Sequence, residues 1–458
     1  MDWRRYLKTE EGHGDPSPGE PAEEEATEEV VGLQRSLSLT ERTRLGLSEA
    51  WYSWVERFGL QRLRSIVSGV ATLPETDEPL YLLGKRYETL NRGEKEDEKE
   101  DDDAQQRAKE RTEAFAEDLG SRAWVTYRSG FSPLGPSLLT NDAGWGCTIR
   151  SGQMLLANCL LVHHKGREWR RRGGEASTSA GHDAPPTAED IFSLFHDHPG
   201  MGSPLSLHNV IKEGAGLGIA PGRWVGPHGL CQAVRRIFTR EEARRRARGG
   251  AGINVAASRC ELSLSLYLAA DAGGIPTLYR SRAVEEATCG SEGAMWRPLL
   301  ILVPVTLGCN SSYVNPCYVP QILTVLSTPQ SVGIVGGKPG SSIYVLGRQG
   351  DRILYLDPHT LKPSVSGVIH HEGAQNDGAG ADSYFCDSVH HMLCARLDPS
   401  LALGFYCRER RDLDDLYERL GELSRKHPTT SIVSLAEEPE PEKDYDAAST
   451  DVDGFQLY

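Results

Sequence analysis

The chain has 458 residues and a formal net charge of -15, with 50 Lys and Arg against 65 Asp and Glu. This acidic balance argues against nucleic acid as a partner, because phosphate binding needs clustered Lys and Arg. Ten cysteines in so long a chain do not suggest a disulfide scaffold. The start of the chain lacks the apolar core of a signal peptide, and no apolar run is long enough to span a bilayer. The composition therefore predicts a soluble, cytoplasmic protein.

The first 107 residues are predicted to be an extension that is largely disordered. Residues 8–31 are rich in Glu, Pro and Gly, and residues 94–103 form a nearly continuous acidic run that is typical of a solvated linker. Between them, apolar residues recur at mostly helical spacing over 45–70. This pattern predicts an amphipathic helix, which either packs on the main domain or contacts a membrane or a partner.

A candidate nucleophile follows in the catalytic region, which we place at residues 108–425. Cys147 is preceded by Gly144 and Gly146, which permit a tight turn and the close approach of another backbone. Residues 151–162 are apolar almost all round, which predicts a buried helix. Cys147 then lies at the N-terminus of that helix, where the macrodipole favours a thiolate. Cys159, inside the same helix, is interpreted as a structural cysteine.

Two basic, Gly-containing stretches interrupt this region, near residues 170–186 and 240–252. Both are predicted to be loop insertions on the surface of the domain. From residue 426 to 458 the chain becomes acidic and contains Pro, which predicts a flexible tail.

A candidate base and its orienting group lie about 200 residues after the cysteine. Residues 342–347 and 352–356 read as two strands joined by a turn. Because side chains alternate along a strand, Asp357 and His359 are expected on one face, where the carboxylate can orient the imidazole. By itself, Asp-Pro-His also suits a surface turn with a free histidine. Its coupling with the setting of Cys147 favours the catalytic interpretation.

An acyl-transfer site also needs a donor for the oxyanion. The backbone N–H of Cys147 is one candidate, Tyr127 is a second and Asn141 is a third. The residues alone leave all three open.

Two other patterns point to no cofactor or metal. The glycines of residues 336–338 lack the earlier glycine of a phosphate loop, and Pro339 follows where that motif needs Ser or Thr. Four residues of zinc-binding type match no standard zinc spacing: Cys386, His390, His391 and Cys394. We therefore expect no cofactor and no metal.

Several ordered blocks resemble the autophagins, a family of papain-like cysteine proteases. These blocks are residues 121–128, 144–154, 224–227, 329–333, 336–339, 355–360 and 397–405. The N-terminal extension and the two insertions resemble the long C/D-type animal forms. The resemblance implies an α+β, papain-like fold with a small family-specific subdomain, a nucleophile at the N-terminus of a buried central helix, and Asp and His on the antiparallel sheet.

The resemblance also assigns roles. It implies that the nucleophile, base, orienting group and oxyanion donor are Cys147, His359, Asp357 and Tyr127. Trp224 and the loop around Pro329 are expected to cover the substrate groove.

The substrates implied by the resemblance are GABARAP-like, ubiquitin-like modifiers of autophagy. One reaction cleaves the precursor after a C-terminal Gly, and a second releases the modifier from phosphatidylethanolamine, with transient membrane contact through the lipidated substrate. Residues 455–458 resemble a modifier-binding motif but end in Tyr where the motif has Leu, Ile or Val. Two alternatives stay open: another acyl-transfer enzyme that uses Cys, His and Asp, or a masked or inactive adaptor that binds the modifier.

Overall fold

The computed structural model describes the following residues: 78–87, 113–171, 185–249, 260–269, 274–289, 295–308, 311–365, 381–386 and 388–439. The expected helix at 45–70, the acidic run at 94–103 and the C-terminal residues 455–458 lie outside these ranges. Within the described ranges, no helix combines the length and the apolar character needed to cross a bilayer.

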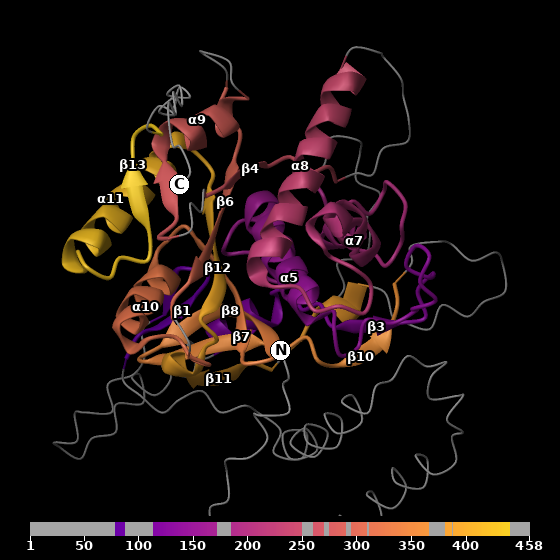
Figure 1. Cartoon of the computed structure of the whole chain (residues 1–458), viewed down its shortest axis with the longest axis horizontal. Coiled ribbons are helices and arrows are strands. Elements are labelled where there is room, and N and C mark those ends of the chain that lie inside the picture. The colour runs from indigo at the N-terminus through magenta and orange to yellow at the C-terminus, as the bar shows by residue number, and fades with distance from the viewer. Residues whose placement is uncertain are drawn as a thin grey trace, which may run out of the picture. The chain divides into compact units, whose positions relative to one another are not determined.

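A mixed sheet forms the centre of the described fold (Figure 1). Its main path runs in the order β11-β9-β8-β7-β12-β6-β4, with β1 added to β8 and β2 added to β1. Neighbouring strands are antiparallel except β4 and β6, which are parallel. The strands are β1 Leu80–Leu82, β2 Lys85–Tyr87, β4 Ser265–Leu268, β6 Leu299–Thr306, β7 Ser331–Lys338, β8 Ser341–Gln349, β9 Arg352–Leu356, β11 His390–Leu393 and β12 Ser400–Cys407.

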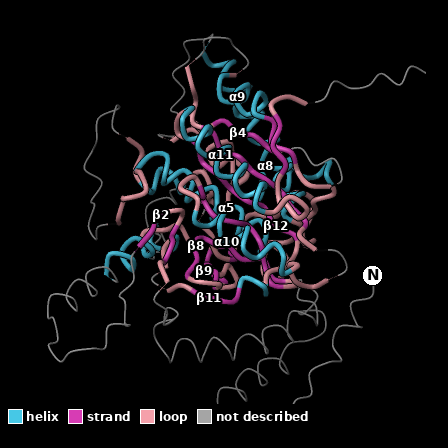
Figure 2. Tube along the Cα trace, turned by 90° about the vertical axis from the view of Figure 1, so that its left-hand side faces the viewer, coloured by secondary structure: helices cyan, strands magenta, loops and turns pink. Residues whose placement is uncertain are grey.

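Two small sheets stand apart from this one. Strand β3 (Tyr127–Ser129) pairs in parallel with β10 (Leu361–Pro363), and β5 (Thr277–Tyr279) pairs in parallel with β13 (Ser434–Ala436). In Figures 1 and 2, β8 and β11 lie in the lower part of the molecule and β4 lies above them. The two strands predicted at 342–347 and 352–356 are confirmed as the antiparallel pair β8 and β9.

Helices cover both faces of the sheet, and each face has its own apolar cluster. Figure 1 shows α5, α7 and α8 on one side of β12, with α10 and α11 on the other. The helices are α5 Cys147–Lys165, α6 Ala188–Ser193, α7 Leu207–Gly214, α8 Pro227–Gly249, α9 Arg280–Thr288, α10 Val319–Ser327 and α11 Arg410–Lys426. Residues 113–120 are also helical. Short 3-10 turns occur at Ala215–Leu217, Pro316–Tyr318, Ala381–Tyr384 and Cys394–Arg396.

Helix α5 is the central helix that the apolar run predicted. Every residue from Cys147 to Val162 is buried. Fully burying each large apolar side chain contributes about 1.5–3 kcal/mol, so this helix is a major part of the core. Its burial fixes the position of its first residue, Cys147, in the middle of the domain.

One predicted loop is wrong over most of its length. Residues 240–249 belong to the end of α8, although 240–252 was expected to be a loop insertion. Arg, Glu and Ala are good helix formers, and ion pairs join residues one turn apart, such as Arg244 with Glu241 and Arg246 with Glu242. In the other predicted insertion, Arg170 pairs with Glu117, whereas 172–184 lies outside the described residues.

The predicted boundaries of the domain are also too narrow. The hairpin of β1 and β2, which we had assigned to the disordered extension, adds two strands to the central sheet through β8. At the other end, Ile432 and Val433 are buried and β13 pairs with β5, so the flexible tail does not begin at 426. Both segments are short apolar runs next to long polar and acidic stretches, which is why composition averaged over the ends of the chain misassigned them.

Candidate active site

The turn before α5 fixes the position of Cys147. Gly144 has φ +82°, a conformation that suits glycine, so the predicted tight turn is confirmed. A Cβ on Gly146 would lie 2.4 Å from Oδ2 of Asp142, so a side chain does not fit there. The close neighbour is therefore a carboxylate rather than the backbone that we had expected. No side chain caps α5, which leaves its first N–H groups near the sulfur.

His359 and Asp357 follow directly after β9. Oδ1 of Asp357 accepts hydrogen bonds from the backbone N–H of His359 at 2.9 Å and from Nδ1 of its ring at 2.5 Å. The other ring nitrogen, Nε2, faces Cys147 and lies 3.1 Å from the hydroxyl of Ser341. The indole of Trp124 donates to the carbonyl of Asp357 at 2.8 Å and helps to hold this segment. Sequence reasoning missed both Ser341 and Trp124.

The sulfur of Cys147 is held by three hydrogen bonds, from His359, the backbone of Ser342 and the hydroxyl of Tyr127. Burial raises the pKa of the Cys147 thiol, but the bond and charge of His359 and the other two bonds outweigh burial and lower the pKa overall. For His359, burial lowers the pKa, whereas Asp357 and Cys147 raise it to about 9. Each partner therefore favours the charged form of the other, which is the arrangement of a thiolate–imidazolium pair.

The carboxyl of Asp357 stays ionised in this site. Burial raises its pKa, but the hydrogen bonds and charge of His359 hold the pKa well below its usual range. A charged carboxylate beside Nδ1 is the arrangement that keeps an imidazole in one orientation.

Of the two side chains considered as oxyanion donors, the structure brings Tyr127 to the nucleophile. Its ring packs edge-on against His359, with 5.3 Å between ring centroids, and its hydroxyl reaches the sulfur. Burial, followed by the charge of Cys147, raises the pKa of Tyr127, so the phenol remains a donor. The described contacts of Asn141 are a backbone bridge to Ser129 and a bond from the indole of Trp145 to its carbonyl.

A narrow groove lies beside this site. Its walls include Thr148, next to the nucleophile, the exposed side chain of Trp224, and Lys338, Gly340 and Ser341 from the turn between β7 and β8. A water-sized sphere can reach about 20 Å³ of this groove. On this measure, which counts the space that the centre of a water-sized sphere can reach, about 10–15 Å³ holds one water molecule, so the groove has room for about one water and a peptide enters only when the groove widens.

The structure places Trp224 at this groove but not Pro329. Pro329 precedes β7, where Gly84 approaches so closely that a Cβ would lie 3.0 Å from Cα of Pro329. The groove meets the other end of β7, near Lys338. The eight residues of β7 span about 26 Å. The expectation that the loop around Pro329 covers the groove is therefore wrong, and the turn that follows Lys338 occupies that place.

A buried charge cluster supports the nucleophile turn, and sequence reasoning did not find it. Arg150, in the first turns of α5, pairs with Asp142 at 2.7 Å and with Asp197 at 2.9 Å, and all three side chains are buried. Asp142 also accepts the backbone N–H of Arg128 at 2.7 Å. The cluster thus ties the turn before Cys147 to two other segments. The available signal was a charged residue, Arg150, directly before the nearly apolar stretch 151–162.

The four zinc-type residues do not assemble into a metal site in the described structure. Cys394 is buried in the core, whereas the sulfur of Cys386 contacts Ser388. No group of three or more His, Cys, Asp or Glu in the described ranges is arranged to hold a metal ion.

The fold and this site define a cysteine peptidase of papain-like architecture. A sequence profile described as the Peptidase C54 catalytic domain matches residues 112–419, about two thirds of the chain. The chain belongs to this family, which includes the autophagins.

Curated relatives support the same assignment. The chain is 35% identical over 351 residues to cysteine protease ATG4A of Oryza sativa subsp. indica, which covers 75% of this chain and 69% of the relative. It is 35% identical over 320 residues to cysteine protease ATG4b of Arabidopsis thaliana, covering 68% and 61%. It is 32% identical over 388 residues to cysteine protease ATG4A of Xenopus laevis, covering 78% and 84%. The resemblance found in the sequence is therefore confirmed at the level of the family.

Proposed function

We propose that this peptidase processes GABARAP-like, ubiquitin-like modifiers: it cleaves the precursor after a C-terminal Gly and releases the modifier from phosphatidylethanolamine. The observation that carries the proposal is the hydrogen-bonded set of Cys147, His359 and Asp357 beside a groove of about 20 Å³. A space this narrow favours a residue without a side chain before the scissile bond.

In the proposed mechanism, the thiolate of Cys147 attacks the glycine carbonyl. The backbone N–H of Cys147 and the hydroxyl of Tyr127 stabilise the resulting oxyanion. The imidazolium of His359 gives its proton to the leaving amine, and a thioester to Cys147 remains. His359, now neutral, takes a proton from water, which attacks the thioester and releases the glycine carboxylate.

One site can serve both reactions because both break an amide bond to the same glycine. In the precursor the leaving amine belongs to the next residue of the chain, and in the lipidated modifier it belongs to ethanolamine. Trp224 and the turn after Lys338 flank the groove. We propose that they separate to admit the C-terminal strand of the modifier, and that membrane contact arises through the lipid of the substrate.

The proposal is tested by incubating the purified full chain with a GABARAP-like precursor that carries a C-terminal reporter. Cleavage after the terminal Gly by the native protein, and none by Cys147→Ala, is the expected result. Binding of the uncleaved precursor by Cys147→Ala shows that the variant is folded. Binding without cleavage by the native protein would support the adaptor alternative instead. Cleavage elsewhere in the precursor would overturn the glycine specificity.

We further propose that the N-terminal extension masks the groove. A truncation that tests this must end before residue 78, because β1 belongs to the central sheet. We expect a faster cleavage of the reporter after such a truncation, and an unchanged rate would refute the masking. The nine cysteines of the described ranges are free thiols, which supports a reducing location such as the cytoplasm.

A further inference from the structure

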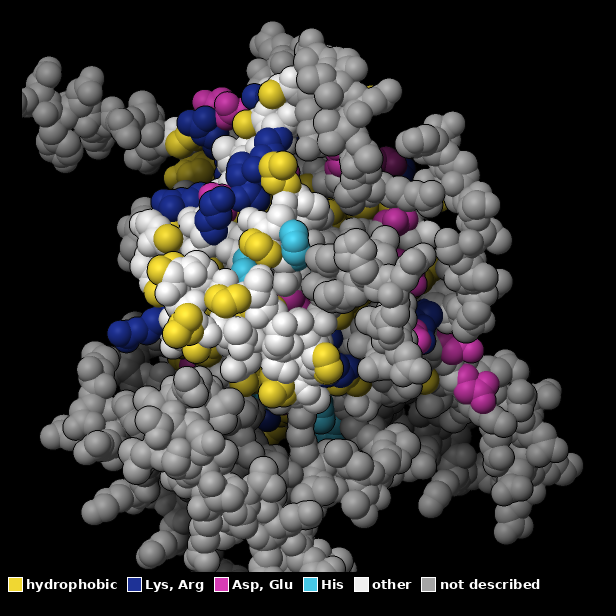
Figure 3. Space-filling model, turned by 90° about the vertical axis from the view of Figure 1, so that its right-hand side faces the viewer, with side chains coloured by type: hydrophobic (Ala, Val, Ile, Leu, Met, Phe, Trp, Pro, Cys, Tyr) yellow, Lys and Arg dark blue, Asp and Glu magenta, His cyan; other side chains and the backbone are white. Residues whose placement is uncertain are grey.

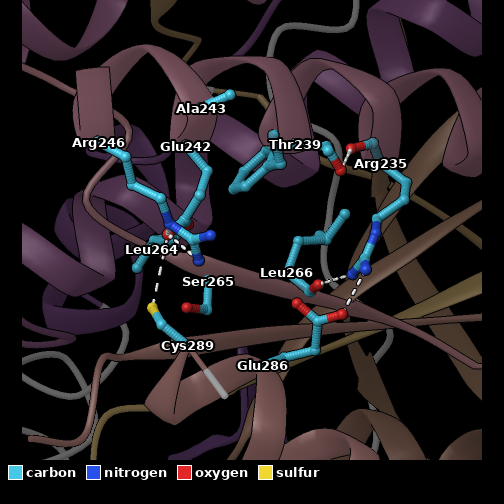
Figure 4. Close-up of a pocket in the computed structure, with 11 residues that line it drawn as sticks. Arg235, Thr239, Glu242, Ala243, Arg246, Leu264, Ser265, Leu266, Glu286 and Cys289 are labelled. Atoms are coloured by element: carbon cyan, nitrogen blue, oxygen red, sulfur yellow. Dashed lines mark hydrogen bonds and ion pairs between the residues drawn. The ribbon is translucent and has the colours of Figure 1, made fainter. Parts of the chain in front are cut away.

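A second cavity, of about 230 Å³, lies between α8, the edge strand β4 and the end of α9, away from the residues of the active site. Figure 4 shows its two charged ends: Arg235 and Glu286 lie at one end, and Arg246, Glu242 and Cys289 lie at the other. Apolar side chains line the space between them, including Phe238, Leu264 and Leu266. Nothing in the catalytic mechanism uses this cavity.

The end near Cys289 has an excess of positive charge. Glu242 is paired with three guanidinium groups: Arg245 at 3.0 Å, Arg246 at 3.1 Å and Arg297 at 2.6 Å. Burial raises the pKa of Glu242, but the hydrogen bond of Arg297 and the neighbouring charges lower it to about 2. One carboxylate therefore neutralises only one of three cations. Figure 3 shows Lys and Arg gathered in one area of a face of this otherwise acidic protein.

The other end is balanced. Arg235 forms an ion pair with Glu286 and also donates to the carbonyl of Leu266 in β4. A paired cation and anion side by side match a ligand group that carries both charges, such as the α-amino and α-carboxyl groups of an amino acid.

Two polar groups at the positive end are available to a ligand. The side chain of Ser265 lines the cavity and the residue is only 3% exposed. Its buried hydroxyl has no hydrogen-bond partner among the described residues. A buried hydroxyl without a partner costs about 1–3 kcal/mol, so a ligand that bonds to it gains that energy back. Cys289 is partly exposed, and its sulfur lies 2.9 Å from Nη1 of Arg297 and 3.5 Å from Oε1 of Glu242, to which the thiol donates, so an incoming disulfide takes the place of that weak bond.

We propose that this cavity binds small acidic disulfides of the γ-glutamyl peptide class, and that Cys289 exchanges with them to carry a reversible mixed disulfide. The terminal carboxylate of the peptide meets Arg246 and the hydroxyl of Ser265. The α-amino group of its γ-glutamyl residue contacts Glu286, and the α-carboxylate of the same residue contacts Arg235. The volume suits one half of the disulfide, and the other half is the part that leaves.

The exchange balances without any further reagent. The sulfur of Cys289 attacks one sulfur of the small disulfide, whose S–S bond breaks as a new S–S bond to Cys289 forms. The released half carries away the electron pair as a thiolate and takes up the proton that Cys289 has lost. One disulfide is consumed and one is formed, and a free thiol reverses the step.

The test treats the full native chain with glutathione disulfide and follows each cysteine by peptide mass mapping. Cystamine, a cationic disulfide, and bis(2-hydroxyethyl) disulfide, a neutral one, are run in parallel. We expect Cys289 to react about tenfold faster with glutathione disulfide than with cystamine at low salt, and the preference to shrink at high salt. Cys289 should also react before the more exposed Cys317.

Variants of α8 provide a matched control. Arg246 lines the cavity, whereas Arg245 pairs with the same carboxylate but does not line it. Arg246→Ala should slow the reaction of Cys289 with glutathione disulfide about fivefold and leave the neutral disulfide unaffected, because only the anionic ligand needs that charge. Arg245→Ala should change the rate less than about twofold, because screening weakens charges that lie outside the cavity. Ser265→Ala should slow the reaction of Cys289 with glutathione disulfide and leave its reactions with the other two disulfides unchanged.

Three results would overturn the proposal. They are equal rates for the anionic and cationic disulfides, modification of Cys317 ahead of Cys289, and equal effects of the two arginine variants. Because Arg246 has a largely exposed side chain, its replacement is not expected to disturb folding, and a thermal unfolding curve checks this.

Discussion

The two cysteines of α5 have the same side chain in the same helix, yet their chemistry is opposite. Cys147, at the first residue, has its thiol pKa lowered by His359 in spite of burial. Cys159, about 18 Å further along the helix, has its thiol pKa raised to about 12 because it is buried without a hydrogen-bonding partner of this kind. Both are almost fully buried.

The difference shows that burial alone does not decide the reactivity of a thiol. What distinguishes the two positions is the end of the helix and the strands that face it. The first turn of α5 meets Ser342 of β8 and His359 after β9, and both of them form hydrogen bonds with the sulfur of Cys147. The middle of the helix packs into the apolar core instead. The following predictions test this contrast, from the largest effect to the smallest.

Replacing each cysteine by Ala should separate the two most clearly. Cys147→Ala is expected to lower turnover by roughly 10⁴-fold or more, because no other group can form the thioester. Cys159→Ala should leave turnover within about twofold, because distant sites without shared partners act independently. Steady-state cleavage of the modifier precursor measures both. Residual activity of Cys147→Ala near the native level would reject the assignment of the nucleophile.

The charge cluster below the first turn should matter for stability. Arg150→Met leaves the carboxylates of Asp142 and Asp197 buried without a cation, which costs about 3–5 kcal/mol of unfolding free energy. Arg245→Met, which breaks an ion pair on the surface of α8, should cost less than about 1 kcal/mol. Urea unfolding of both variants measures the difference. Equal losses would show that the buried cluster has no special role in holding the turn.

The pH profile reports the charge state of the catalytic pair. The active form needs the thiolate and the imidazolium, and the pKa of His359 is raised to about 9. Turnover should therefore hold across neutral pH and fall about tenfold per unit as the pH rises above 9. In Asp357→Asn the carboxylate that raises the pKa of His359 is lost, so the alkaline limb should move to lower pH by about one unit or more. An unmoved limb would exclude Asp357 as the orienting group.

The smallest effect is expected in the apolar core. Cys159→Ala removes one buried sulfur from close packing and should cost about 1 kcal/mol, or about 2–4 °C in Tm. Thermal unfolding followed by circular dichroism checks this value. A loss of several kcal/mol would mean that Cys159 does more than fill space.

Much of the site was predictable because it depends on local patterns. The apolar run after Cys147 predicted α5, the alternation before Asp357 predicted β8 and β9, and the glycine at 144 predicted a tight turn. Each of these features depends on residues that are close together in the chain, so the sequence pattern alone is enough to predict it. The family resemblance added the assignment of Tyr127, whose hydroxyl contacts the sulfur of Cys147, and its role at the oxyanion stays a prediction.

Other features depended on contacts between distant segments. Composition assigned the β1–β2 hairpin to the extension, because three-residue strands are too short to recognise without the β8 edge that they extend. The family resemblance placed the loop around Pro329 at the groove, but the whole of β7 separates Pro329 from the turn after Lys338 that lines the groove.

The sequence by itself determined the family and the buried helix, and it predicted the nucleophile and its base, because ordered motifs and residue spacing are sufficient for these. Only the tertiary structure decided which groups surround each thiol: Ser342 and Tyr127 at Cys147, and Arg297 and Ser265 around Cys289. The physical reason is that the electrostatic environment of a side chain depends on distances of a few ångströms in space. Residues that are far apart in the chain set those distances only after the sheet and its helices have packed.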